Sequence, residues 1–305
     1  MLIQWFPGHM HKASKEIRAA LHDMDLMIEI IDARLPFSSQ NPALAKLRGD
    51  KPCIKVLSKC DLADERLTQK WQAYLEREQN VKTLAVTMTQ TETIRQLHAL
   101  CHQLVPRADN RSKPLHALIT GIPNVGKSTL INILAGRVVA KTGNEPAVTK
   151  HQQRIDVGGG LILFDTPGIL WANIDNKNSG YRLAVTGAIK DTAISHEDVA
   201  LFAAQYLLQA YPALIKARFQ CEALPSSDIE LLEHIGRKRG CLRAGGRVDL
   251  DKVAKILLQE LRSATLGKMT LETPEMMVEE LAELAIIRAE KAAKKLARLE
   301  KKQKT

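Results

Sequence analysis

The sequence predicts an α/β domain followed by an all-helical domain, and three observations support this prediction. Over the first two thirds of the chain, apolar runs of strand length alternate with helical patterns, which is typical of a doubly wound sheet. Nearer the C-terminus the strand pattern fades, and apolar positions such as Val253, Leu257 and Leu261 fall on one helical face. The hydrophobic content of 45% is that of a folded protein. We therefore expect two domains, residues 1–178 and residues 179–305.

The expected elements of the first domain follow from its short apolar runs and its longer amphipathic stretches. Aliphatic and β-branched runs bounded by polar residues indicate strands, and apolar residues spaced three or four apart indicate helices. The expected strands are Leu26–Asp32, Cys53–Ser58, Lys82–Val86, Leu115–Thr120, Gln153–Val157 and Leu161–Asp165. The expected helices are Asp64–Gln79, Thr91–Leu104 and Lys127–Ala135.

The composition limits the class of partner and the cellular compartment. A formal net charge of +10 and a pI near 9.4 indicate a polyanionic partner, either nucleic acid or an acidic membrane surface. The five cysteines are scattered and form no C-x-x-C pair, so we expect reduced packing residues and no zinc site. No apolar run reaches the roughly 18 residues of a membrane helix, and no signal-peptide core is evident. We expect a cytoplasmic protein that does not enter a membrane, and we take it to be a monomer.

The segment from Gly121 to Ser128 reads G-x-x-x-x-G-K-S and lies between an expected strand and an expected helix, as a phosphate-binding loop requires. The glycines let backbone N–H groups close around phosphates at a helix N-terminus. In this interpretation Lys127 is catalytic and reaches the β- and γ-phosphates, while the Ser128 hydroxyl binds Mg²⁺. The alternative is a glycine-rich turn that happens to fit the pattern. The nucleotide-binding residues expected here are Asn124, Val125, Gly126, Lys127, Ser128 and Thr129.

A second motif, Asp165-Thr-Pro-Gly168, ends the expected strand Leu161–Asp165, and we call it the switch motif. Asp165 can hold Mg²⁺ through water, and the amide of Gly168 can contact the γ-phosphate during hydrolysis. The alternative is an ordinary turn, because each of these residues favours turns. Thr149, between the two motifs, is either a second hydroxyl ligand for Mg²⁺ or an ordinary loop threonine.

Guanine specificity is indicated by Ser58-Lys59-Cys60-Asp61, which reads S-K-x-D at the end of a strand and which we call the base motif. The Asp61 carboxylate can accept hydrogen bonds from N1–H and the exocyclic amine of guanine, a donor pair that adenine lacks. The Lys59 stem would pack along the base, and Ser58 would contribute to the same site. The alternative is a turn in which Asp61 caps the next helix. Guanine-specific proteins normally place this motif last, whereas here it comes first, which predicts a circularly permuted P-loop GTPase domain.

With these motifs in place, the sequence resembles the circularly permuted ribosome-assembly GTPases of the YlqF type, the ribosome biogenesis GTPase A family. The resemblance covers almost the whole chain and implies GTP hydrolysis to GDP and phosphate, with Mg²⁺, coupled to late maturation of the large ribosomal subunit. Beyond the three nucleotide motifs it rests on Ile3–Met10, Asp32–Pro36, Asn41–Pro42, Arg239–Leu250 and Leu271–Pro274.

The chain also departs from the family pattern. Ser58 replaces the usual Asn, which should weaken contacts to the base and to the phosphate-binding loop, and Ala147 replaces the Gly expected before Thr149. Ile169 occupies the position where many GTPases carry a water-orienting glutamine, so intrinsic turnover should be slow. The resemblance nominates His9 as the catalytic water-positioning group, the alternatives being a loop histidine or an RNA contact. It also nominates Asn124 as a ligand for K⁺.

The C-terminal stretch from Ile286 to Thr305 holds eight Lys or Arg residues against two Glu. On a helix these cations gather on one face beside a stripe of Ala and Leu. The alternatives to RNA binding are a solvated charged face and a membrane-surface helix, although the stripe lacks an aromatic anchor. We expect contacts to RNA phosphates that weaken with salt. The expected RNA-binding residues are Lys291, Lys294, Lys295, Arg298 and Lys302.

Three functions remain open at the level of sequence. The favoured one is a switch GTPase that binds the large ribosomal subunit, its precursor and rRNA. A P-loop kinase or an RNA-modifying enzyme is a second class, but no additional nucleophile or acceptor-site motif supports it. The third is an RNA-binding scaffold that holds GTP with little hydrolysis, which the hydrophobic Ile169 keeps open.

Overall fold

The computed structural model describes residues 8–106, 113–140, 153–171 and 174–303. Their backbone contains one six-stranded sheet with the strand order β3-β2-β1-β4-β6-β5. Neighbouring strands are parallel except for β5, which runs antiparallel to β6 at one edge. The strands are β1 Leu26–Asp32, β2 Cys53–Ser58, β3 Val81–Ala85, β4 Leu115–Gly121, β5 Gln153–Asp156 and β6 Leu161–Asp165.

The register of the parallel strands brings their carboxyl ends to one edge of the sheet. Asp32 at the end of β1 is opposite Ser58 at the end of β2. Ile119, near the end of β4, is opposite Asp165 at the end of β6. Because β1 lies between β2 and β4, the base motif, the phosphate-binding loop and the switch motif emerge at the same edge. Ligands of open α/β sheets bind outside this carboxyl edge.

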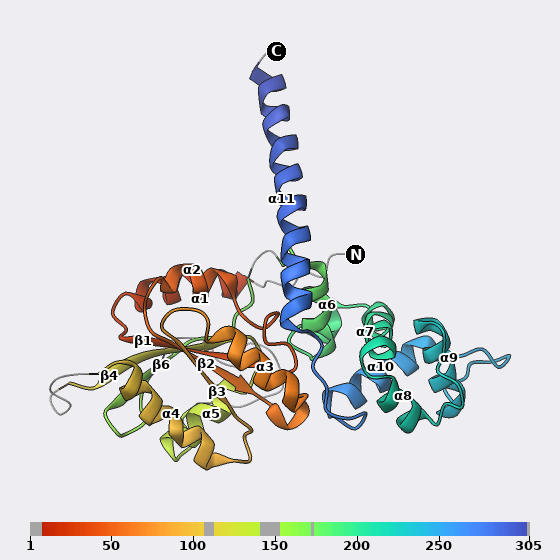
Figure 1. Cartoon of the computed structure of the whole chain (residues 1–305), viewed down its shortest axis with the longest axis horizontal. Helices are drawn as coiled ribbons and strands as arrows, with labels where there is room; N and C mark the ends of the chain where they lie inside the picture. The colour runs from red at the N-terminus through yellow and green to blue at the C-terminus, as the bar shows by residue number, and fades with distance from the viewer. Residues whose placement is uncertain (1–7, 107–112, 141–152, 172–173, 304–305) are drawn as a thin grey trace.

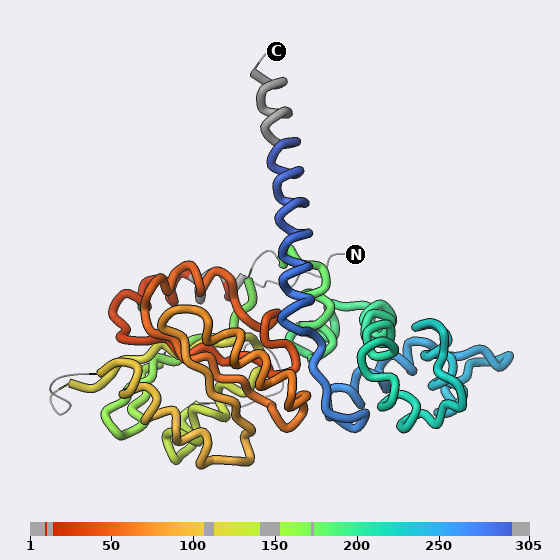
Figure 2. The backbone as a smooth tube through the Cα atoms, viewed as in Figure 1, coloured from red at the N-terminus to blue at the C-terminus, as the bar shows by residue number. Residues whose placement is uncertain are grey.

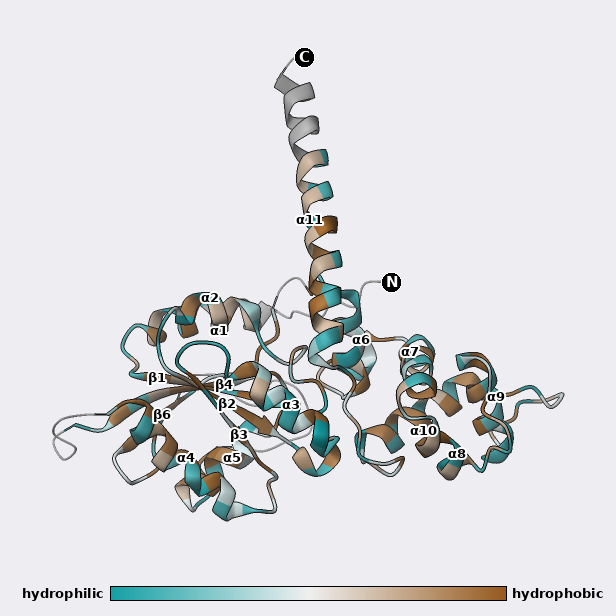
Figure 3. Ribbon diagram, viewed as in Figure 1, coloured by the Kyte–Doolittle hydropathy of each residue, from teal (hydrophilic) through white to brown (hydrophobic). Residues whose placement is uncertain are grey.

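Helices cover both faces of the sheet, with α1 and α2 on one face and α4 and α5 on the other (Figure 1). The sheet between them is apolar: β1 and β2 are buried at every position, and the strands are mostly brown in the hydropathy view (Figure 3). Expected strands and helices agree with the observed ones within a few residues, but α1 and α2 were not predicted. The helices are α1 Gly8–Leu21, α2 Pro42–Arg48, α3 Glu65–Leu75, α4 Thr91–Leu104 and α5 Lys127–Ala135.

Beyond the switch motif the described residues form helices, as expected, with a single isolated bridge between Leu242 and Val248. α10 packs against both α7 and α9, and its buried face includes Val253, Leu257 and Leu261. The buried apolar core runs continuously from the sheet into this bundle. The helices are α6 Lys177–Val185, α7 His196–Ala210, α8 Pro212–Phe219, α9 Asp228–Lys238, α10 Leu250–Arg262 and α11 Pro274–Gln303.

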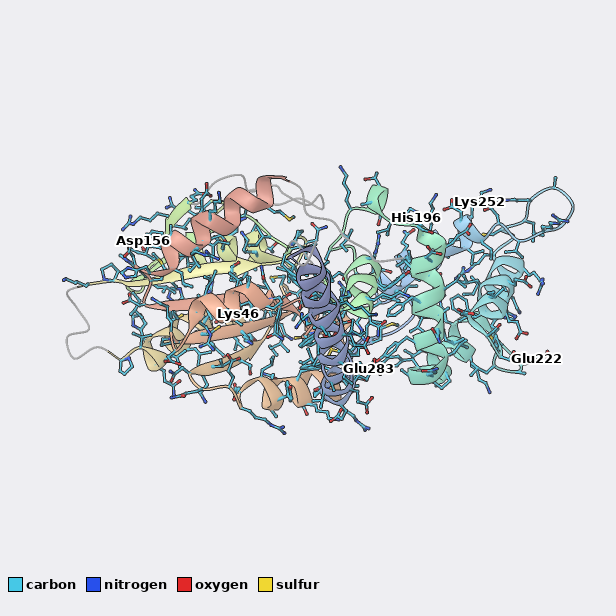
Figure 4. All side chains as sticks on the ribbon, turned by 90° about the horizontal axis from the view of Figure 1, so that it is seen from above. Lys46, Asp156, His196, Glu222, Lys252 and Glu283 are labelled. Atoms are coloured by element: carbon cyan, nitrogen blue, oxygen red, sulfur yellow. The ribbon has the colours of Figure 1, made fainter. Side chains whose placement is uncertain are left out.

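The last helix, α11, begins against the α/β domain and then leaves the body of the protein (Figure 1). Met277 is fully buried in a small apolar cluster with Ile31, Leu57 and Trp71, and the indole Nε1–H of Trp71 donates to the carbonyl of Glu272 at 3.0 Å. Figure 2 follows the chain out of the sheet, through the helical bundle and back to this cluster. Seen from above, α11 stands between the α/β domain and the bundle (Figure 4).

The base of α11 is also tied to α6, the first helix after the switch motif. The buried guanidinium of Arg182 forms a two-pronged ion pair with Glu280, at 2.6 and 3.0 Å. Asn176 and Asn178 donate to the same carboxylate at 2.7 and 3.0 Å. α6 thereby contacts the C-terminal helix as well as the bundle, and the division at residue 178 stays a prediction.

Candidate nucleotide site

The phosphate-binding loop leaves β4 at Gly121 and enters α5 at Lys127. A Cβ at Gly121 would lie 2.8 Å from the carbonyl oxygen of Ile30, so only glycine fits this close approach of two strands. Gly126 has a φ of +94°, a conformation that L side chains rarely adopt. Since Gly126 has no side chain to cap α5, the first-turn N–H groups of the helix can receive a phosphate. Ser128 and Thr129 lie half-buried in that first turn.

Lys127 and Asp165 form a buried ion pair between the phosphate-binding loop and the switch motif. The Lys127 ammonium donates to Oδ1 of Asp165, and the lysine and the aspartate are 6% and 0% exposed, respectively. Among the described residues, the buried Oδ2 of Asp165 has no hydrogen-bond partner. Burial raises the pKa of Asp165 above its usual value, and the ammonium of Lys127 only partly opposes this. A buried carboxylate oxygen with an open coordination position suits a hard cation such as Mg²⁺.

The switch motif packs directly against the phosphate-binding loop. Gly168 is so close that a Cβ there would lie 3.3 Å from the backbone of Pro123. The amide of the next residue, Ile169, donates to the carbonyl of Gly121 at 3.2 Å, and the Ile169 side chain is 2% exposed. The structure therefore places Gly168 against the phosphate-binding loop. The residue that follows it has a buried hydrocarbon side chain, which cannot orient a water molecule.

The base motif is connected to the phosphate-binding loop through the hydroxyl of Ser58. Its Oγ lies 2.7 Å from the carbonyl oxygen of Val125 and 3.0 Å from that of Ile31, so a single proton is shared between two acceptors. Ser58 therefore makes a direct contact with the loop, and the expected weakening relative to Asn stays a prediction. Lys59 follows in the left-handed conformation, with a φ of 59°, and Asp61 is exposed in the short 3-10 helix Cys60–Leu62.

Sequence reasoning missed two charged residues that position the base motif, Asp32 and Arg34. The Asp32 carboxylate accepts from the Arg34 guanidinium at 2.7 and 2.9 Å and from the Lys59 ammonium at 3.0 Å. Burial disfavours the charged form of Asp32, but the two cations outweigh it and hold the pKa of this carboxyl well below its usual range. In the sequence, these two residues appear only as an Asp and an Arg two positions apart at the end of a strand. They form part of the family resemblance, but the sequence pattern assigns neither of them a function.

A cleft of about 810 Å³ separates these motifs from the helical bundle. Lys59 and Asn124 line it on the α/β side, and residues of α7 and α10 line it on the other side. Asn124, which has a φ of 59°, donates its side-chain amide to the carbonyl of Gly187 at 2.9 Å. The bundle therefore forms one wall of this cleft, a feature that the motif pattern did not predict.

Arg262, the last residue of α10, connects the two walls of this cleft. Its side chain donates to the carbonyls of Ala184 and Val185 at 2.9 Å each and pairs with Asp191 at 2.9 Å. Its own carbonyl accepts from Arg34 at 3.3 Å. A chain of polar contacts thus runs from Lys59 through the buried carboxylate and Arg34 to the C-terminal end of α6.

Several predicted site residues lie elsewhere or beyond the described part. Thr149 and Ala147 lie outside the described residues, and so does the side chain of His9, whose backbone is in α1. Lys291 and Lys294 are exposed on α11, away from the cleft. The side chains of Lys295, Arg298 and Lys302 are outside the described set. Within the described chain, no helix is both long and apolar enough to cross a bilayer.

Comparison with known proteins identifies consistent relatives. A family model described as "50S ribosome-binding GTPase" matches residues 116–224. The ribosome biogenesis GTPase A of Bacillus cereus is 44% identical over 291 residues, which cover 93% of this chain and 98% of that protein. The protein of the same name from Thermotoga maritima is 30% identical over 273 residues, 90% of this chain and 95% of its own. A crystal structure of GNP-bound YlqF from T. maritima superposes with a TM-score of 0.60 at 26% identity, covering 87% of this chain and 99% of that one.

Proposed function

Because the chain belongs to the ribosome biogenesis GTPase A family and is a P-loop GTP hydrolase, we propose that it acts as a GTP-driven switch in late assembly of the large ribosomal subunit. Three nucleotide motifs that are far apart in the sequence converge at one sheet edge, joined by the Ser58–Val125 and Lys127–Asp165 contacts, and this convergence supports the proposal. The description of the matching family model, which names the 50S subunit, favours the large subunit as the partner.

In this proposal the nucleotide is held at three points. Asp61 accepts the guanine donors, and the phosphates rest on the N-terminal turn of α5 with Lys127 beside them. Ser128 and Asp165 hold Mg²⁺, with Thr149 as the further hydroxyl ligand. When bound, Mg²⁺ neutralises charge that develops on the phosphates during hydrolysis. The other expected contacts are the neighbouring loop residues Asn124, Val125, Gly126 and Thr129.

Hydrolysis in this proposal is slow until a partner completes the site. The buried Ile169 cannot position water, so the role falls to another group, and His9 remains our candidate. Asn124 donates its amide nitrogen to Gly187, and in this proposal its amide oxygen binds a K⁺ ion beside the phosphates, which would supply positive charge where the transition state needs it. Replacing His9 with Ala should lower subunit-stimulated turnover while GTP affinity stays the same, and unchanged turnover would remove His9 from the mechanism.

The partner surface in this proposal is the exposed, cationic part of α11. Lys291 and Lys294 are exposed there and can reach the phosphates of rRNA. Lys295, Arg298 and Lys302 share the same stretch of sequence. A role in ribosome assembly implies a cytoplasmic location, and the protein is proposed to act as a monomer.

A scaffold that holds GTP without using it is the second candidate function, favoured by the apolar Ile169. Sedimentation with purified large subunits separates the two. A switch should bind subunits tightly when loaded with a non-hydrolysable GTP analogue and at least several-fold more weakly when loaded with GDP. The two affinities can differ only if nucleotide binding is coupled to subunit binding. Equal binding in the two states would favour the scaffold.

A further inference from the structure

The C-terminal end of α9 and the turn that follows it form a compact, strongly cationic segment that the proposed nucleotide cycle does not use. We call residues 237–247 the basic tip. It contains five Lys or Arg residues and no Asp or Glu: Arg237, Lys238, Arg239, Arg243 and Arg247. All five are exposed. In Figure 1 the connection between α9 and α10 projects from the end of the bundle farthest from the sheet.

Backbone contacts give the basic tip a defined shape. Leu242 and Val248 form an antiparallel bridge, and the amide of Arg243 donates to the carbonyl of Arg247 at 2.8 Å. Below the bridge, Val248 packs so tightly on α9 that a Cβ at Gly236 would lie 2.3 Å from it. The tip therefore contains a short hairpin anchored to α9, whose backbone sets the positions from which Arg243 and Arg247 extend.

The apex of the basic tip is narrow. Between its two flanking arginines the chain reads Ala244-Gly245-Gly246, and the two glycines have φ values of +80° and +75°. A Cβ at either glycine would meet nothing within 4 Å, so the backbone conformation, not crowding, is what requires glycine. With almost no side-chain bulk, the apex can approach a grooved surface closely while Arg243 and Arg247 flank it.

Intramolecular ion pairs neutralise only part of the basic tip. Arg237 pairs with Glu233 at 2.7 Å, Arg239 with Glu260 at 2.6 Å and Arg243 with Asp249 at 3.0 Å. Within the described part of the chain, Lys238 and Arg247 have no such partner. These two cations are therefore the ones available to an external anion.

We propose that the basic tip is a second docking surface for ribosomal RNA, which binds phosphates through Lys238 and Arg247 independently of α11. This inference rests on the proposed ribosomal function and adds a specific contact to it. A protein partner would need apolar area to bury, and Leu242, 45% exposed, is the one large apolar side chain exposed among the described residues of the tip. Clustered cations around a thin apex without aromatic residues instead suit recognition of an RNA helix by phosphates and shape.

The test is sedimentation of the full chain, loaded with a non-hydrolysable GTP analogue, with purified large ribosomal subunits at several salt concentrations. The variant carries Lys238→Ala and Arg247→Ala. The matched control carries Lys46→Ala and Arg66→Ala, two exposed cations of the α/β domain that change the net charge equally. Circular dichroism and thermal unfolding check that both remain folded.

The tip variant should lose roughly tenfold in affinity near 0.1 M salt, and the slope of log affinity against log salt should fall by about 1.5 to 2. The control should bind like the wild type. Equal losses in both variants would overturn the inference, because they would reflect net charge alone. Weaker binding with an unchanged salt slope would also overturn the inference, since it would indicate that the tip contacts a ribosomal protein and not RNA phosphates.

A further variant, Lys291→Ala with Lys294→Ala, separates this inference from the proposed function. If the tip variant binds subunits normally while this α11 variant does not, the tip is excluded as a docking surface and the proposed function stands. If the wild type itself does not bind subunits, the proposed function fails.

Discussion

The hydroxyl of Ser58 lies 2.7 Å from the carbonyl oxygen of Val125 and joins the base motif on β2 to the phosphate-binding loop after β4. A residue that departs from the family pattern thus still makes the contact that holds the two halves of the nucleotide site together. Because both groups are fully or almost fully buried, the contact is shielded from water.

Replacing Ser58 with Ala should loosen this junction. The buried carbonyl of Val125 would lose its donor, which costs about 1–3 kcal/mol in the free energy of unfolding. GDP should bind several-fold more weakly, because the base motif and the loop no longer share a fixed spacing. Calorimetric titration with GDP and urea unfolding measure the two effects. Cys at this position, which keeps the size but donates weakly, is the control and should fall between Ser and Ala.

Asp165→Asn should separate cation binding from folding. The variant keeps an oxygen near Lys127 but removes the negative charge that suits Mg²⁺, so subunit-stimulated turnover should fall by about two orders of magnitude. Affinity for GDP in the absence of Mg²⁺ should change far less. Stopped-flow measurement of nucleotide release with and without EDTA checks this. A variant that still responds to Mg²⁺ as the wild type does would contradict the assignment.

The ion pair between Asp32 and Arg34 should make stability depend on acid pH. The pKa of Asp32 in the folded state lies below its ordinary value of 3.8, so the stabilisation by this ion pair is complete above pH 3.8 and disappears as the pH falls further. Asp32→Asn should lower the free energy of unfolding by about 3–5 kcal/mol at pH 7, because a buried guanidinium loses its partner. The difference between variant and wild type should shrink below pH 3.8. Urea unfolding at pH 7 and pH 3 measures it, and a constant difference would refute the assignment.

Glu280→Gln should release the base of α11 from α6. Its partner Arg182 is buried, so loss of the Glu280 carboxylate charge should lower the free energy of unfolding by at most about 3–5 kcal/mol. The ratio of subunit affinities with the GTP analogue and with GDP should also fall. This is expected because α6 follows the switch motif and, through Glu280, connects that motif to α11. Asp175→Asn, which removes the exposed partner of Arg288, is the control and should change stability by less than about 1 kcal/mol. A normal nucleotide preference in the Glu280 variant would exclude this route of coupling.

Potassium should stimulate hydrolysis more than sodium. The amide nitrogen of Asn124 donates to the carbonyl of Gly187, and we propose that its amide oxygen binds a monovalent cation. Turnover of GTP should therefore be several-fold faster in KCl than in NaCl at equal ionic strength, and Asn124→Ala should abolish the difference. Equal rates in the two salts would show that no K⁺ site operates.

Much of the fold followed from local sequence signals. The strands Leu26–Asp32, Cys53–Ser58 and Leu161–Asp165 were predicted to the residue because each is a mostly apolar run that is buried at all or nearly all of its positions. The short α2 was missed because its seven residues start with a proline and give no clear period, and α1 because its apolar face is sparse. Local periodicity is a weak signal for such elements.

The site was predictable where a motif is contiguous and not where it is assembled by the fold. The loop from Gly121 to Ser128 carries its own signature, and the structure places it as expected between β4 and α5. The contacts of Arg34 with Arg262, and of Asn124 with Gly187, join residues far apart in the chain and leave no trace in local pattern. The bundle wall of the cleft was for that reason unforeseen.

The most direct test of the central claim is turnover of GTP by the purified protein in potassium buffer, with and without large ribosomal subunits, with ATP as the control. We predict slow intrinsic hydrolysis of GTP, a rise of at least tenfold when subunits are added, and no measurable turnover of ATP. Turnover of ATP would contradict the assignment of Asp61, and GTP turnover that does not respond to subunits would contradict the switch.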